Sequence, residues 1–159
     1  MTEFLPKNPN FEEVVRGSFS RQPFMDHVGA SLTKLKPGFC EIEVAHQKAL
    51  TQQHGFFHGG VVASLADSAA GYAAYSLFPE NSTVLTVDLK VNYLNPSDGE
   101  KLIARASVIR FGKKLCHLKG DVFAVRGDTE IHCLTGLFTM MCLMGKPDSG
   151  LAVGPGSIG

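Results

Sequence analysis

The chain has 159 residues, enough for one domain with a sizeable core, and its fifteen basic and fifteen acidic residues cancel to a formal charge of zero. That balance argues against a nucleic-acid partner. No apolar run reaches the roughly 18–20 residues that span a membrane, and the start of the chain lacks the pattern of a signal peptide. The scattered cysteines form no C-x-x-C pair, which is typical of reduced thiols. We therefore expect a cytoplasmic protein with no nucleic-acid or membrane partner.

The first 22 residues are expected to form a lead-in and a short helix. Apolar residues recur at helical spacing over 11–19, with Asn10 in position to cap the helix and two glutamates in its first turn. Pro23 ends this helix, and the segment that follows is expected to form a short turn or a single helical turn. We expect the main domain to span 23–145. A tail rich in Gly and Pro, 146–159, is expected to be flexible.

Alternating apolar and polar residues predict six strands in the main domain. Two of them flank the turn pair Pro37-Gly38, and four follow a central helix predicted over 59–77. The strands are predicted over 30–36, 39–45, the segment 83–96, 101–110, 115–125 and 130–143. In the third strand, the odd-numbered residues from Leu85 to Tyr93 are apolar and are predicted to share one face. This order of elements indicates an α+β fold.

The central helix is apolar on nearly every side. Its apolar residues include Val61, Val62, Leu65 and five alanines. A helix of this kind has to be covered on most of its surface. One long antiparallel sheet curled around one helix satisfies both this requirement and the number of predicted strands.

The stretch HGFFHGGVVASLADSAAGYAA, residues 54–74, differs most from ordinary domain sequence. Histidines lead into paired glycines, and Asp67 is the only charged residue of the helix that follows. Gln52 precedes His58 by six residues, and Asp67 follows Gly60 by seven. This pattern resembles the active-site signature of acyl-CoA thioesterases of the phenylacetyl-CoA and hydroxybenzoyl-CoA type. The resemblance implies the hotdog fold, in which a curved antiparallel sheet wraps a long helix.

The resemblance also implies roles for the motif residues. In this family the N–H after the histidine polarises the thioester carbonyl, a role that falls on Gly59, and the Gly60 N–H is a candidate second donor. Such N–H groups have no partner within the helix, so they can bind an oxyanion. Gln52 would contact the thioester or water, and His58 would orient the site. Asp67 would activate water or attack as a nucleophile, and burial should raise its pKa.

Further substrate contacts are expected around this motif. Thr86 matches, within one residue, a Ser or Thr that family members often place near the thioester. Ser68 shares a helix face with Asp67 and Gly71, a strip of polar and small residues where a carboxylate could meet substrate. Phe57 and its neighbours suggest an apolar acyl pocket, which suits aromatic and medium aliphatic acyl groups equally.

Cofactor and metal binding are not expected. Coenzyme A would enter as part of the substrate, and Arg110 and Lys113 could hold its phosphates, although a solvated turn is the commoner explanation for basic residues in a hairpin. His54 and His58 have the spacing of a metal pair on a helix, but the glycines around them indicate a loop, and no third ligand is evident.

The spacing of the motif argues for two subunits. Seven residues separate Gly60 from Asp67, and they span about 10 Å along a helix axis. Asp67 therefore cannot reach a carbonyl held at the N-terminus of its own helix. A two-fold homodimer with composite sites resolves this, in agreement with the family resemblance, and such dimers could pair further into a tetramer.

Two alternatives to an acyl-CoA thioesterase remain open. A hotdog hydratase or dehydratase would pair a histidine with an acid in a different motif. A non-catalytic hotdog module would bind acyl-CoA without turnover.

Overall fold

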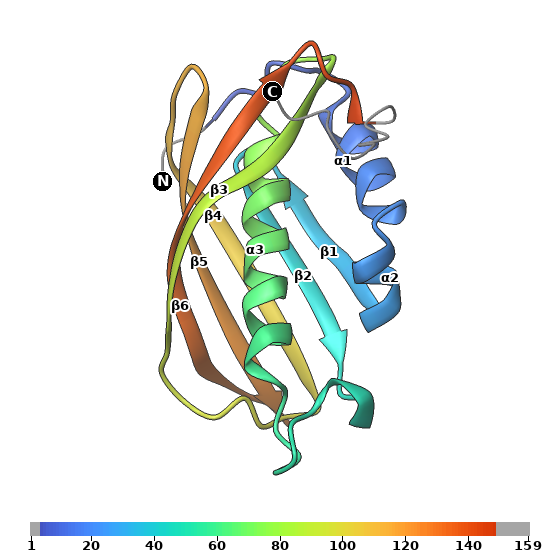
Figure 1. Ribbon diagram of the computed structural model, residues 1–159, viewed down its shortest axis with the longest axis vertical. Helices are drawn as coiled ribbons and strands as arrows, with labels where there is room; N and C mark the ends of the chain where they lie inside the picture. The colour runs from blue at the N-terminus through green and yellow to red at the C-terminus, as the bar shows by residue number, and fades with distance from the viewer. Residues whose placement is uncertain (1–3, 149–159) are drawn as a thin grey trace, which may run out of the picture.

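A single six-stranded antiparallel sheet curls around one long helix, as the computed structural model shows for residues 4–148 (Figure 1). The helices are α1 (Phe11–Ser20), α2 (Pro23–Val28) and α3 (Gly59–Tyr75), with a 3₁₀ turn at Lys48–Leu50. The strands are β1 (Ala30–Lys36), β2 (Phe39–Ala45), β3 (Ser82–Tyr93), β4 (Lys101–Phe111), β5 (Leu115–Arg126) and β6 (Thr129–Met144). Their order in the sheet is β1-β2-β4-β5-β6-β3. The predicted α+β hotdog architecture is confirmed.

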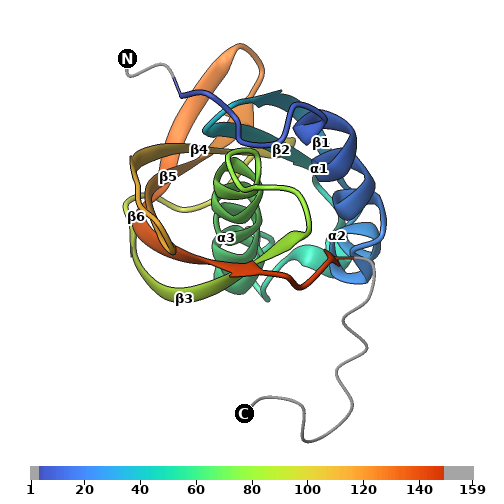
Figure 2. The same ribbon diagram turned by 90° about the horizontal axis from the view of Figure 1, so that it is seen from above.

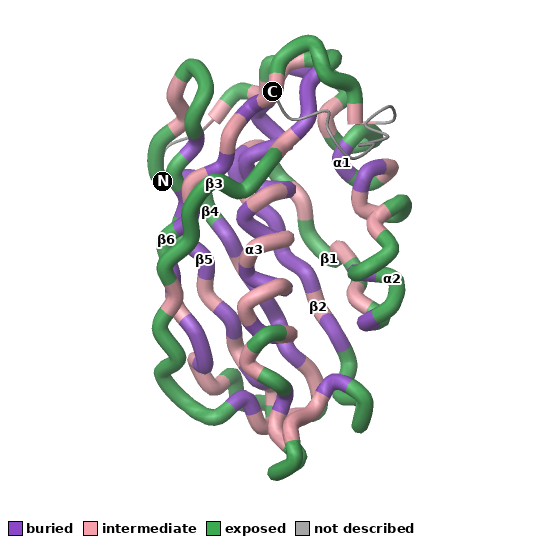
Figure 3. The backbone as a smooth tube through the Cα atoms, in the orientation of Figure 1, coloured by how far each residue is buried: buried purple, intermediate pink, exposed green. Residues whose placement is uncertain are grey.

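The core lies between the inner face of the sheet and α3. Seen from above, the strands surround α3 on one side while α1 and α2 lie on the other (Figure 2). The inner residues of β2, Cys40, Ile42 and Val44, are fully buried, as their alternation predicts. Five alanines of α3 are almost completely buried too, and their small side chains let the strands approach the helix closely. Burial is therefore concentrated on α3 and the strands behind it (Figure 3).

Strand β3 departs from the predicted alternation because it contains a β-bulge. Its register against β6 shifts between Thr86, which is opposite Met140, and Asp88, which is opposite Thr139. Met140 is completely buried, so Thr86 faces α3. Beyond the bulge the phase has changed, and Leu89 lies opposite the buried Phe138. The prediction of one common face for the odd-numbered residues is therefore wrong: the extra residue in the bulge turns Thr86 inward.

Strand β3 is also an edge of the sheet, and its surface is unusually apolar. Leu85, Val87, Leu89 and Tyr93 are each between 43% and 53% exposed. An exposed edge strand with large apolar side chains is a surface that pairs readily with another strand.

The N-terminal segment folds mostly as predicted. Helix α1 runs one residue further than expected, and the segment after it forms the short helix α2, with Pro23 at its first position. Asn10 occupies the N-cap position of α1, but its side chain makes no capping bond. Instead the side-chain oxygen of Asn8 accepts from the Asn10 N–H at 2.8 Å.

The predicted tail lies largely outside the described residues, which end at Asp148. The Asp148 carboxylate accepts hydrogen bonds from Arg21 at 2.8 Å and from Thr83 at 2.9 Å. The boundaries of the predicted domain and tail stay predictions. Between residues 4 and 148, no helix combines the length and the apolar character needed to cross a membrane.

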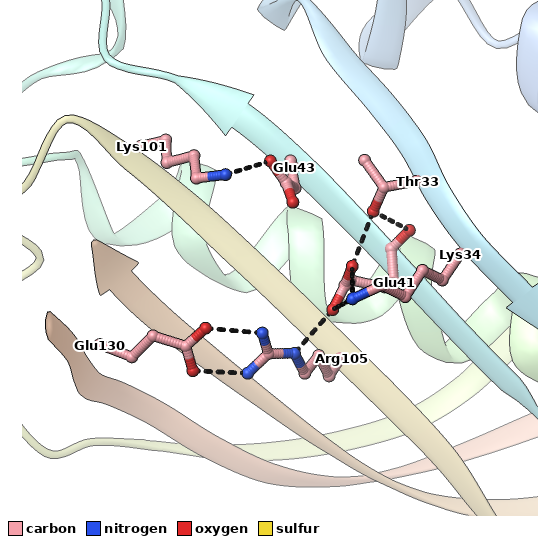
Figure 4. Close-up of polar contacts among 7 residues, drawn as sticks. All are labelled: Thr33, Lys34, Glu41, Glu43, Lys101, Arg105 and Glu130. Atoms are coloured by element: carbon pink, nitrogen blue, oxygen red, sulfur yellow. Dashed lines mark hydrogen bonds and ion pairs between the residues drawn. The ribbon is translucent and has the colours of Figure 1, made fainter. Parts of the chain in front are cut away.

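The outer face of the sheet carries a network of charged side chains (Figure 4). Glu41 points to this face, yet its side chain is only 2% exposed. Arg105 donates to Glu41 at 2.7 Å and forms a bidentate pair with Glu130. Burial disfavours the charged form of Glu41, but hydrogen bonds from Arg105, Lys34 and Thr33 outweigh it and hold its pKa below the ordinary value.

Candidate active site

The N-terminus of α3 is capped by the histidine of the motif. His58 lies at the N-cap, and its Nδ1 accepts a hydrogen bond from the Gly60 N–H at 2.9 Å. That bond places the hydrogen of a neutral ring on Nε2. It also occupies the Gly60 N–H, which was expected as a second oxyanion donor. The Gly59 N–H has no hydrogen-bond partner among residues 4–148, so it is the donor available to a ligand.

Tyr93 fixes the peptide that follows the free N–H group. Its hydroxyl donates to the Gly59 carbonyl at 2.6 Å. A Cβ on residue 59 would lie 3.2 Å from the Tyr93 hydroxyl oxygen, so the ring packs directly against the glycine. Sequence reasoning treated Tyr93 only as a strand residue. The sequence offers one indication of this role: Tyr93 is an aromatic residue with a hydroxyl group, and it ends the strand that follows the motif helix.

A surface hollow of about 380 Å³, here called the Gly59 hollow, opens beside this helix end. It is lined by Gln52, Phe56, Phe57, Gly59, Tyr93, Leu94, Asn95, Pro96 and Ser97. Three of the predicted site residues therefore come together here: Gln52, Phe57 and Gly59. The Gln52 side-chain oxygen accepts from the His54 N–H at 3.3 Å, while Phe57 is 3% exposed and forms part of the core beneath the hollow.

A second hollow of about 390 Å³, here called the Asp67 hollow, lies further along α3. Its lining comes from α1, α2 and the residues between them, from α3 and β3, and from Asp148 after β6: Ser18, Arg21, Gln22, Pro23, Asp67, Ser68, Gly71, Tyr72, Val84, Leu85, Thr86 and Asp148. The predicted residues Asp67, Ser68 and Thr86 meet here. The wall contributed by Arg21, Gln22 and Asp148 was not expected from the sequence.

Asp67 is half-buried, and its one hydrogen-bonding partner within residues 4–148 is Thr86. The Thr86 hydroxyl donates to its carboxylate at 2.9 Å, a contact that the bulge in β3 makes possible. Burial raises the pKa of Asp67, and the bond from Thr86 lowers it by less, so the pKa lies above the ordinary value. A carboxylate whose pKa is raised in this way is a better proton acceptor than an exposed aspartate.

The two hollows are separate in one chain. Neither of them is lined by both Gly59 and Asp67. The rise of a helix over eight residues is about 12 Å, which agrees with this separation.

Two expected substrate contacts lie away from both hollows. Arg110 is the last residue but one of β4, and Lys113 lies in the turn that follows this strand. Neither residue lines the Gly59 hollow or the Asp67 hollow. Phe111, between them, stacks on Phe78 just beyond the C-terminus of α3. In Figure 1 the hairpin of β4 and β5 is at the opposite end of the molecule from the start of α3, where Gly59 is the first helical residue. One chain alone therefore does not bring Arg110 or Lys113 to either hollow.

The cysteines offer no nucleophile at this site. All four are buried and unpaired with one another, and burial raises the pKa of Cys40 and of Cys116 to about 12. Such thiols stay protonated and unreactive. In the part of the chain from residue 4 to residue 148, no group of three His, Cys, Asp or Glu side chains is arranged to hold a metal ion.

Comparisons with known proteins assign this chain to a family. The model of the thioesterase superfamily matches residues 54–131. The crystal structure of a thioesterase family protein from Silicibacter pomeroyi is 44% identical, with a TM-score of 0.84 over 85% of this chain and 99% of that one. The chain belongs to the thioesterase superfamily. Membership places it among the thioester hydrolases.

Two curated relatives add to this assignment. A medium/long-chain acyl-CoA thioesterase, YigI of Escherichia coli, is 30% identical over 58% of this chain and 70% of its own length. A putative esterase of Halobacterium salinarum is 37% identical over 55% of this chain, and the match spans 61% of that protein.

Proposed function

We propose that this thioesterase hydrolyses acyl thioesters of coenzyme A to the free acid and coenzyme A. The observation that carries the proposal is the half-buried Asp67 carboxylate, with its raised pKa and its Thr86 partner, at the wall of a hollow. The name of the Escherichia coli relative supports acyl-CoA as the substrate class.

The Gly59 N–H acts on the thioester carbonyl. It donates to the carbonyl oxygen and stabilises the negative charge that develops there, with the help of the positive end of α3. One donor of this kind typically lowers the barrier by about 2.7–4 kcal/mol. Gln52, on the wall of the same hollow, contacts the thioester or the water. His58 orients the donor by capping the helix.

Asp67 supplies the proton acceptor. Its carboxylate removes a proton from water, the hydroxide adds to the carbonyl carbon, and the C–S bond breaks to release the thiolate, which is then protonated. In the nucleophilic variant, Asp67 itself adds to the carbonyl and water cleaves the resulting mixed anhydride. Both variants need Asp67 ionised, with Thr86 donating to it.

The site is completed by a second copy of the chain. Thr86 of β3 lies beside Asp67, and Tyr93 of the same strand lies beside Gly59. If two exposed β3 edges pair antiparallel about a point between Leu89 and Lys90, Thr86 of one copy comes level with Tyr93 of the other. Asp67 of one copy then faces Gly59 of its partner. The exposed apolar side chains of β3 support this pairing.

Release of free thiol from a panel of acyl-CoAs tests the hydrolysis. The wild type should release thiol, and Asp67→Ala should lose about 10²–10⁴-fold in kcat. Asp128→Ala, which removes an exposed carboxylate from a turn, is the matched control and should keep full activity. Equal turnover by the wild type and Asp67→Ala would contradict the mechanism.

The same panel separates the two alternatives. Binding of acyl-CoA by the wild type without thiol release would favour a non-catalytic module. A change in enoyl-CoA absorbance without thiol release would instead indicate a hydratase.

A purified heterodimer tests the composite site. Co-expression of Asp67→Ala and Gly59→Pro subunits with different tags isolates dimers that carry one subunit of each kind. Such a dimer keeps one complete site and should show about half the wild-type rate, although each parent homodimer is nearly inactive. A heterodimer as inactive as its parents would place the complete site within one subunit.

A further inference from the structure

Gly71 occupies an unusual position on α3. It lies four residues after Asp67, on the same helix face, and lines the Asp67 hollow. A glycine in the middle of a helix destabilises it relative to alanine, because the unfolded chain gains conformational freedom and the helix loses a side chain that could pack. A reason for glycine at this position therefore has to come from its surroundings.

Residues 4–148 supply no such reason. Among them, a Cβ built on residue 71 meets no atom within 4 Å apart from the backbone of its own helix. By contrast, a Cβ on Gly120 would lie 2.8 Å from the ring of Phe138, and a Cβ on Gly136 would lie 2.8 Å from the Lys90 carbonyl oxygen. The backbone of Gly71 also does not adopt a positive φ, the conformation that favours glycine. The space in front of Gly71 is thus left open by the described part of the chain, and Gly71 lines the same hollow as Asp67.

The far wall of that hollow is charged. Arg21 and Asp148 form an ion pair of 2.8 Å, and both residues line the Asp67 hollow. Both also line a neighbouring hollow, whose lining includes Tyr75. Since Tyr75 follows Gly71 by four residues, the ion pair lies beyond Gly71 as seen from Asp67. An apolar chain that starts at Asp67 therefore passes Gly71 and then meets a pair of charges that it cannot favourably desolvate.

We propose that the Asp67 hollow receives the acyl chain and that Gly71 determines the length of chain that fits. This inference rests on the proposed function and narrows its substrate class: acyl groups long enough to pass Gly71 and short enough to end before the Arg21–Asp148 pair. Gly71 is a specificity-determining residue whose missing side chain leaves the passage open.

A larger side chain at residue 71 tests this proposal. Gly71→Leu places a good helix former in the open space, and thiol release is followed with butanoyl-, octanoyl- and dodecanoyl-CoA. For butanoyl-CoA, kcat/KM should stay within about twofold of the wild type, while the best longer substrate should lose about 10–200-fold, the range for one methylene that no longer fits. Gly71→Ala should shorten the preferred chain less strongly.

An exposed residue of α1 provides the control. Ser20 does not line the Asp67 hollow, and its hydroxyl donates to the Gly17 carbonyl at 2.8 Å. Ser20→Ala also introduces a better helix former, and it should leave the chain-length profile unchanged. A profile shifted equally by both alanine variants would overturn the proposal.

Two further measurements separate this inference from the proposed hydrolysis. Calorimetry records the binding of the butyl, octyl and dodecyl thioethers of coenzyme A, which cannot be hydrolysed. If the wild type hydrolyses no acyl-CoA, yet Gly71→Leu weakens only the longer thioethers, the hydrolase assignment is wrong and the role of Gly71 stands. Sedimentation then checks the assembly. An altered oligomeric state in Gly71→Leu, or an equal loss for every chain length, would show that residue 71 does not select the chain.

Discussion

The two hollows along α3 are built in different ways. The Gly59 hollow is formed by two short stretches, 52–59 and 93–97, that fold over each other at one end of the helix. Local contacts hold it: Thr51 bridges to Phe57, and the Gly55 N–H donates to the Gln52 carbonyl. The Asp67 hollow draws its walls from Ser18 to Asp148, across nearly the whole described chain.

The two hollows also differ in how much of their lining lies inside the segment that the family model matches. Most of the Gly59 hollow falls inside residues 54–131, the segment that the family model matches. In contrast, the wall of the Asp67 hollow formed by α1, α2 and Asp148 falls outside that segment. A polarising backbone N–H can be shared across a family, while the walls that meet the acyl chain can vary from member to member.

The strongest test of this comparison replaces the hydrogen of the Gly59 N–H. Proline is favoured at the first position of a helix, and its ring carbon takes the place of that hydrogen. His58 has φ −63° and ψ 134°, the extended conformation that a residue before proline requires. Gly59→Pro should therefore fold and lose about 10²–10³-fold in kcat, measured as thiol release.

Gly59→Ala is the control for the added carbon. It keeps the N–H and places the same Cβ against Tyr93, so any loss common to both variants reports crowding rather than the missing donor. Equal activity of the alanine and proline variants would remove the Gly59 N–H from the mechanism.

The next test concerns a region remote from both hollows. Arg105→Met leaves the buried Glu41 carboxylate with only Lys34 and Thr33 as partners (Figure 4). Because one partner of a buried charge is lost, unfolding should become easier by about 2–3 kcal/mol, and Tm should fall by roughly 5–10 °C. The rate of thiol release by the folded enzyme should not change.

A more exposed pair on the same face serves as the control. Lys101 bonds Glu43 at 2.6 Å, but both side chains are more exposed than Glu41, so Lys101→Met should lower the free energy of unfolding by at most about 1 kcal/mol.

The pH dependence of stability gives a second test of the Glu41 network. The pKa of Glu41 is lowered in the folded state, so its stabilisation is complete above the ordinary value of about 4.3 and is lost as pH falls through the lower folded value. A deficit in Arg105→Met that persists after this carboxylate is protonated would contradict the explanation.

The sequence predicted local structure better than it predicted contacts between distant segments. Helical spacing and strand alternation identified the order of elements, and they placed the first hairpin at its observed residues. The bulge at Val87 escaped prediction because one extra residue in a strand leaves no periodic signal and yet reverses which face each neighbour occupies. Thr86 was therefore linked to the site only through family resemblance.

Contacts between segments that are distant in the chain leave no pattern in the sequence. Arg21 and Asp148 are 127 residues apart, and no spacing rule connects them. The hairpin with Arg110 and Lys113 was placed correctly along the chain, but which end of the helix it approaches depends on the path of the whole sheet. The sequence thus predicted the part of each hollow that the motif contributes, and it did not predict the parts that distant segments contribute.

A smaller effect is expected from the partner of Asp67. Thr86→Val keeps the shape of the side chain and removes its hydrogen bond to the carboxylate. That bond lowers the pKa of Asp67, so its loss should raise the pKa further above the ordinary value. Because the reaction needs the ionised carboxylate, the acidic limb of the kcat/KM profile should move to higher pH. The profile of Ser68→Ala, which lines the same hollow without bonding Asp67, should keep its position. An unmoved acidic limb in Thr86→Val would mean that Asp67 does not control it.

The smallest effect is expected at the edge of the Gly59 hollow. Tyr93→Phe removes the hydroxyl that donates to the Gly59 carbonyl and keeps the ring that packs against the glycine. A neutral hydrogen bond contributes about 0.5–1.5 kcal/mol, so kcat should fall by about 2–10-fold, because the neighbouring N–H is less firmly oriented. Tyr93→Phe in the Gly59→Pro background should have no further effect on kcat, since the donor that Tyr93 orients is already gone. Additive losses in the double variant would show that Tyr93 acts on the substrate directly and not through Gly59.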